Sequence, residues 1–66
     1  MESGELIKRL QDAGWQIRGG KKTNGGSHIT LCKPGIRKII TLPHPRKELS
    51  KGMLRQAQQI AGIKLI

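Results

Sequence analysis

The sequence is poor in aromatic residues, in cysteine and in long apolar runs. Trp15 is its only aromatic residue, which excludes the base-stacking platforms of two or three rings used by single-strand binders and RNA-recognition sheets. Its single cysteine, Cys32, excludes an intramolecular disulfide and fits a reducing compartment. No apolar run reaches the ~18 residues of a membrane span, and no signal peptide opens the sequence. We therefore expect a soluble, cytoplasmic chain without membrane contact.

Acidic residues are also scarce. Lys and Arg number 13 against four Asp and Glu, which gives a formal net charge of +9. No acid lies between Asp12 and Glu48, although eight basic residues do. Such a run of basic residues attracts polyanions, so we expect nucleic acid as the partner. The alternatives are an acidic protein partner and a basic surface that serves only solubility. Because a single 66-residue domain buries only roughly 60% of its unfolded surface, the binding site should be an open face and not a deep pocket.

Hydrophobic periodicity predicts one domain over residues 1–66, with the order helix, three strands, helix. Ser3 is the expected cap of the first helix and Ser50 that of the second, which Gly62 ends. An irregular, basic, glycine-rich loop is expected at residues 19–26. A type II turn is expected from Lys33 to Ile36. The predicted helices cover residues 4–13 and 51–61, and the predicted strands cover 15–18, 27–33 and 36–42.

These elements predict an α+β fold, α-β-β-β-α, with both helices on one face of a three-stranded antiparallel sheet. If Ile29 and Leu31 face the helices, then His28, Thr30 and Cys32 share the opposite face. The lone Trp15 is expected in the core.

His28 is the candidate catalytic residue. It follows the glycine-rich loop at the start of a predicted strand, and histidine is the side chain whose unperturbed pKa, about 6.5, allows acid or base chemistry near neutral pH. RNA carries its own nucleophile, the 2′-hydroxyl, so one base and several cations suffice to cleave it without metal. Ser27 and Lys22 are the nearest candidates in sequence for phosphate contact. The alternative for His28 is a non-catalytic role, in which this single strand histidine is structural or simply exposed.

The other candidates are less specific. His44, between two prolines, either touches substrate or only packs the corner before the second helix. Cys32 would need a partner base to act as a catalytic thiol, and four residues of strand separate it from His28 by about 13 Å, too far to share a metal. Arg37 and Lys38 are further candidate phosphate contacts. We expect no metal site and no cofactor.

Short motifs along nearly the whole chain resemble the HicA (YcfA-like) family of bacterial toxins. The resemblance rests on their order and spacing: SGELIK at 3–8, AGW at 13–15, GSH at 26–28, TLPHP at 41–45, EL at 48–49, KG at 51–52, LR at 54–55 and AG at 61–62.

The resemblance implies a double-stranded-RNA-binding-domain-like fold and metal-independent endoribonuclease action on mRNA, with His28 of the GSH motif as the catalytic residue. It also implies a HicB-type antitoxin that covers the active face, and we expect the free toxin to be a monomer. Two competing interpretations remain open. One is a non-catalytic basic RNA-binding domain, and the other is a DNA-binding or ribosome-associated protein.

Overall fold

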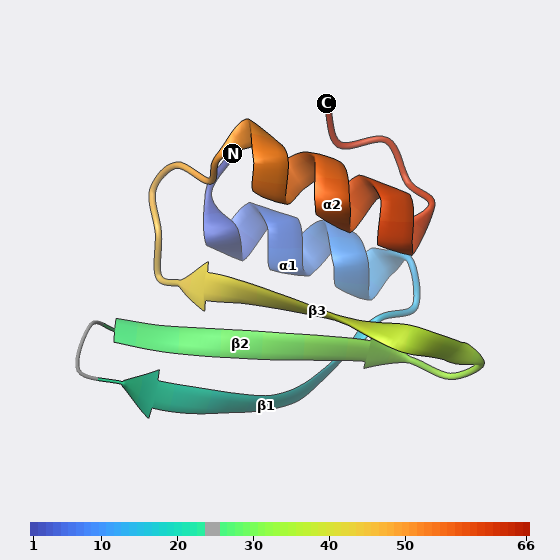
Figure 1. Ribbon diagram of the computed structural model, residues 1–66, viewed down its shortest axis with the longest axis horizontal. Coiled ribbons are helices and arrows are strands. Elements are labelled where there is room, and N and C mark those ends of the chain that lie inside the picture. The colour runs from blue at the N-terminus through green and yellow to red at the C-terminus, as the bar shows by residue number, and fades with distance from the viewer. Residues whose placement is uncertain (24–25) are drawn as a thin grey trace.

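The computed structural model contains two helices and one sheet (Figure 1). It describes residues 1–23 and 26–66, and it describes side chains for residues 1–18 and 28–66. The sheet is antiparallel, with strand order β1-β2-β3, and both helices lie on the same side of it (Figure 1). The predicted α-β-β-β-α fold is therefore confirmed. In chain order the elements are α1 (Ser3–Asp12), β1 (Gln16–Thr23), β2 (Gly26–Lys33), β3 (Ile36–His44) and α2 (Lys51–Ala61).

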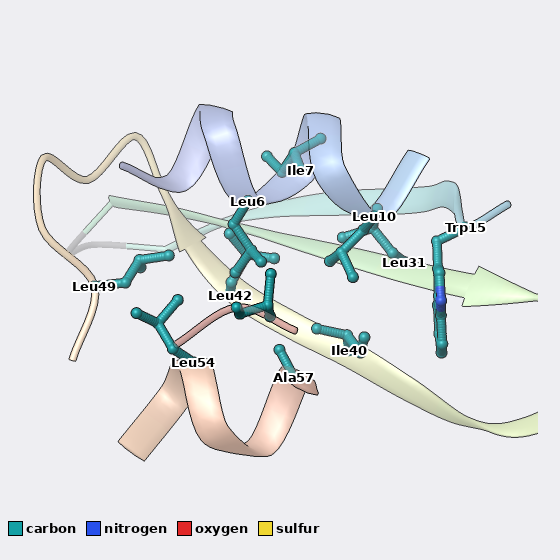
Figure 2. Packing of buried hydrophobic residues seen from close by; sticks show 11 residues of the cluster. Leu6, Ile7, Leu10, Trp15, Leu31, Ile40, Leu42, Leu49, Leu54 and Ala57 are labelled. Carbon is teal, nitrogen blue, oxygen red and sulfur yellow. The ribbon is translucent and has the colours of Figure 1, made fainter. Parts of the chain in front are cut away.

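The core lies between the two helices and one face of the sheet (Figure 2). Both helices contribute apolar side chains at helical spacing, and β2 and β3 contribute alternate residues. Trp15 is 2% exposed, as predicted. The central buried side chains are Leu6, Leu10, Leu31, Ile40, Leu42, Leu54 and Ala57. The sheet face turned away from the helices, here called the open face, has no helix packed on it among the described residues.

The predicted capping residues are confirmed for α2, but the predicted cap at the start of α1 is not. Ser50 caps α2 by accepting a hydrogen bond from the Met53 N–H at 3.2 Å, and Gly62 ends it with φ 71°. The predicted cap at Ser3 is wrong: Glu2 occupies the cap position without a side-chain bond, and Ser3 is the first helical residue. Ser3 is 1% exposed, and its hydroxyl makes tertiary contacts in place of a local cap.

The prediction of an irregular loop over residues 19–26 is wrong where the structure describes it. β1 continues to Thr23 and β2 begins at Gly26, and these two residues pair; residues 24 and 25 lie outside the described part. Glycine disfavours strands only weakly, and a neighbouring strand supplies the hydrogen bonds that hold the chain extended. A register shift between Ile17 and Gly19 marks an irregularity at the first glycine of this stretch.

β3 is also longer than predicted, because it continues through Pro43 to His44. Proline lacks an N–H and therefore interrupts a central strand, but an edge strand needs hydrogen bonds on one side only. β3 is an edge strand, so Pro43 stays in register opposite His28. The turn before β3 contains Gly35 with φ 85°, as the predicted type II turn requires.

Candidate active site

His28 lies on the open face, near the start of β2. The next residue, Ile29, pairs with the buried Leu42, and Leu31 is itself buried beneath the helices. Because side chains alternate along a strand, His28 and Thr30 point to the other side, as predicted. His28 is exposed, and Thr30 Oγ1 lies 3.2 Å from Thr41 Oγ1 on the neighbouring strand. The imidazole is therefore accessible to a ligand laid across the sheet.

The neighbours of His28 come from both adjacent strands. In the backbone register, Lys21 of β1 and Pro43 of β3 lie opposite His28. Pro43 supplies a rigid, half-buried neighbour on one side. Sequence reasoning missed Lys21, because treating residues 19–26 as a loop hid the strand pairing that places its backbone beside His28. A count of the register outward from the pair Thr23 and Gly26 would have found it.

His44 lies on the helix-facing side of the sheet. It follows Leu42 by two residues, and its Nδ1 is 2.8 Å from Ser3 Oγ at the start of α1. The Arg46 N–H also donates to Ser3 Oγ at 2.8 Å, and the Ser3 N–H donates to the Arg46 carbonyl at 2.9 Å. Ser3 thus links α1 to the segment between β3 and α2.

This network also fixes the chemistry of His44. Because Ser3 Oγ accepts the Arg46 N–H, its own proton can be donated to His44 Nδ1, and the proton of a neutral imidazole is then assigned to Nε2. His44 shares the helix-facing side of the sheet with Leu42, whereas His28 lies on the open face, so the two histidines are on opposite faces. Of the two roles that the sequence left open for His44, this geometry favours packing at the corner.

Two of the four predicted phosphate contacts, Arg37 and Lys38, lie far from His28 along β3. Arg37 and Lys38 are exposed, but they lie six and five residues before Pro43 on β3. At ~3.3 Å per residue, these separations are about 20 Å and about 17 Å. Lys22 and Ser27 pair in the backbone register, one step from His28, but their side chains lie outside the described residues.

Further basic residues lie at the same end of the sheet as His28. Figure 1 shows that β1 ends, β2 begins and β3 ends on one side of the molecule, where both helices also begin. The connection from β3 to α2 crosses this end and carries Arg46 and Lys47, both exposed. Sequence reasoning did not select these two residues, although their position directly after the TLPHP motif was a usable signal.

Cys32 is half-buried on β2, four residues from His28, where the β2–β3 register shifts between Leu31 and Lys33. Among the residues that the structure describes, no three His, Cys, Asp or Glu side chains are grouped to hold a metal ion. Within the same residues, neither helix is long and apolar enough to cross a membrane.

Two helices packed on one face of a three-stranded antiparallel sheet, in the order α-β-β-β-α, place the chain in the double-stranded-RNA-binding-domain-like class of α+β domains. The model of the family described as "HicA toxin of bacterial toxin-antitoxin" matches residues 3–63. The chain belongs to the HicA toxin family and is the toxin of a toxin–antitoxin system.

A solved structure supports the same assignment. It is titled "HicA3 and HicB3 toxin-antitoxin complex" and contains a chain 83% identical to this one. The match covers 100% of both chains with a TM-score of 0.92. No curated protein sequence shows a significant match.

Proposed function

We propose that this toxin is a metal-independent endoribonuclease that cleaves mRNA and so inhibits translation, with His28 as the general acid or base. The observation that carries the proposal is the exposed imidazole of His28 on the open face of a chain with net charge +9. An open basic face suits an extended polyanion, and His28 is a proton-transfer group placed on it.

The proposed reaction uses the nucleophile that RNA carries. His28 takes the proton of a ribose 2′-hydroxyl, and the resulting oxyanion attacks the adjacent phosphorus in line with the 5′-oxygen. The new O2′–P bond forms as the P–O5′ bond breaks, which leaves a 2′,3′-cyclic phosphate and a 5′-hydroxyl. The departing oxygen takes its proton from water or from a second acid, because the imidazole that has just accepted a proton cannot serve both oxygens in one step.

Polar and basic residues around His28 would bind the RNA strand and stabilise negative charge on the phosphorane oxygens. Lys21 is a candidate because its backbone pairs with His28, and Lys22 and Ser27 are candidates because they form the next backbone pair. Arg37 and Lys38, about 17–20 Å along β3, would contact phosphates several nucleotides away from the scissile bond.

The proposed partner is a HicB-type antitoxin that covers the open face and blocks access to His28. A chain of net charge +9 favours a partner with acidic residues at the interface. We propose that the free toxin is a monomer and that it acts in the cytoplasm, where its mRNA substrate is found.

Cleavage of a labelled mRNA in excess EDTA tests this function. We expect the unaltered chain to cut and His28→Ala to lose cleavage, while the matched control Gln11→Ala on the exposed side of α1 still cuts. Equal cleavage by His28→Ala would assign the chemistry to another residue. Binding of RNA without cleavage by any of the three would replace the enzyme with a non-catalytic RNA-binding domain.

A further inference from the structure

β3 has an outer edge that no other strand covers in the described part of the chain. The strand order is β1-β2-β3, so β3 pairs with β2 on one side only. Ile36 and Ile39 on this strand are 36% and 43% exposed, although their type is usually buried. An edge strand with exposed apolar side chains is a template for another extended chain.

A groove runs beside this strand, between β3 and α2. It consists of two adjoining hollows of about 220 Å³ and about 580 Å³, which share Ile39, Gln56 and Ile60. We call it the β3–α2 groove. Met53 and Ala57 add apolar lining at one end, and the amide of Gln59 lies at the other. Its lining suits a polypeptide that offers both apolar side chains and hydrogen-bonding groups.

The charges around the groove select among possible occupants. Arg37 and Lys38 line its wider end. Glu48 is the only acidic residue after Asp12, and its carboxylate accepts a hydrogen bond from the Met1 amino group at 3.1 Å. A second copy of this +9 chain would be repelled, and basic residues on edge strands oppose pairing between identical chains. The same charges attract an acidic strand.

RNA fits the groove poorly. It has apolar surface that a phosphate backbone would not use, given by Ile39, Ile40, Met53, Ala57 and Ile60. It also contains no aromatic ring on which a base could stack, because the only aromatic residue, Trp15, is buried in the core. The wider end of the groove also lies away from His28: Ile39 is four residues before Pro43, about 13 Å along β3. An acidic polypeptide is the occupant that both the lining and the charges favour.

We propose that an extended, acidic segment of the antitoxin pairs with the free edge of β3 as a fourth strand and fills the β3–α2 groove. Alternate residues of that segment would place apolar side chains against Ile39 and Ile60, with carboxylates near Arg37 and Lys38. This inference rests on the proposed pairing with a HicB-type antitoxin. It gives the antitoxin a contact with the toxin beyond the one that covers His28.

The test measures the affinity of purified HicB3, the partner in the 83% identical complex, for the toxin and two variants. Ile39→Glu places a carboxylate in the groove. Ile17→Glu is the matched control, because Ile17 is 48% exposed against 43% for Ile39 and lies on β1, the opposite edge strand. We expect Ile39→Glu to raise the Kd at least about tenfold, since it removes an apolar contact and repels an acidic strand, and Ile17→Glu to change it less than about twofold.

RNA cleavage by the same variants separates this inference from the proposed function. Ile39→Glu should still cut RNA in the absence of HicB3, because His28 is unchanged, and it should escape inhibition by HicB3. A second outcome is that Ile39→Glu binds HicB3 more weakly while neither the unaltered chain nor any variant cuts RNA. In that case the ribonuclease proposal fails and the groove inference stands.

Three results would overturn the groove inference. The first is equal HicB3 affinity for Ile39→Glu and Ile17→Glu. The second is a loss of RNA cleavage by Ile39→Glu with unchanged HicB3 affinity, which would assign the groove to RNA. The third is no binding of HicB3 by the unaltered chain.

Discussion

Replacing Ser3 by alanine should destabilise the fold more than its small volume implies. The Ser3 side chain is 1% exposed, and its hydroxyl contacts both the Arg46 N–H and His44 Nδ1 at 2.8 Å. Alanine fills most of the same space but leaves both of these polar groups without that partner. An unsatisfied buried polar group costs about 1–3 kcal/mol, and these two groups are only partly buried.

We therefore expect Ser3→Ala to lower the free energy of unfolding by about 2–3 kcal/mol. A domain of this size has a total stability of about 3–10 kcal/mol, so the variant loses a large share of it. At about 4–8 °C per kcal/mol for small domains, the melting temperature should fall by about 10–20 °C.

Urea unfolding followed by Trp15 fluorescence measures this effect, because the only tryptophan is 2% exposed in the folded chain. Ser50→Ala is the matched control: it removes an exposed helix cap and should cost about 1 kcal/mol. In a double-mutant cycle with His44→Ala, the combined loss should fall short of the sum of the single losses by about 1 kcal/mol. A Ser3→Ala variant within about 0.5 kcal/mol of the parent would refute the assigned role of the network.

Three further predictions concern the core, the turn and the open face. Leu42→Ala, at a position with no exposed surface, should cost about 2–5 kcal/mol by thermal unfolding, and a cost below 1 kcal/mol would contradict the packing. Gly35→Ala should cost about 1–2 kcal/mol in the same assay, because backbone strain at φ 85° is the expected penalty and no neighbouring atom lies within 4 Å of the added methyl. An unchanged melting temperature would argue against that turn. In RNA titrations at several salt concentrations, Arg37→Gln should make the slope of log K against log salt shallower by about 0.7, whereas an unchanged slope would remove Arg37 from the RNA path.

The sequence predicted the fold well where local chemistry and burial agree. Ser50 and Gly62 bound α2 as predicted, because a cap and a left-handed end depend on a few neighbouring residues. The alternation of Ile29 and Leu31 correctly placed His28 on the open face, since one side of the sheet is buried.

The failures arose where a distant segment decides the local structure. Ser3 has the sequence of a helix cap, but Arg46 and His44 engage its hydroxyl across the fold. Gly19 and Gly20 have low strand propensity, but pairing with β2 keeps them extended. The candidate site was predicted in part for the same reason. His28 stands out from its chemistry alone, whereas the position of Lys21 beside it depends on strand register, which short-range patterns do not fix.

The uncovered sheet face has a consequence for how such a toxin can evolve. The buried side chains that hold the domain together come from the helices and the helix-facing residues of the sheet. Exposed positions on the other face, such as Arg37 and Thr41, contribute little to that core, and substitutions at such positions usually change stability by less than about 0.5 kcal/mol. Ligand preference can therefore diverge among relatives while the scaffold stays constant. In this small domain, the surface that carries His28 is therefore among the regions that tolerate substitution.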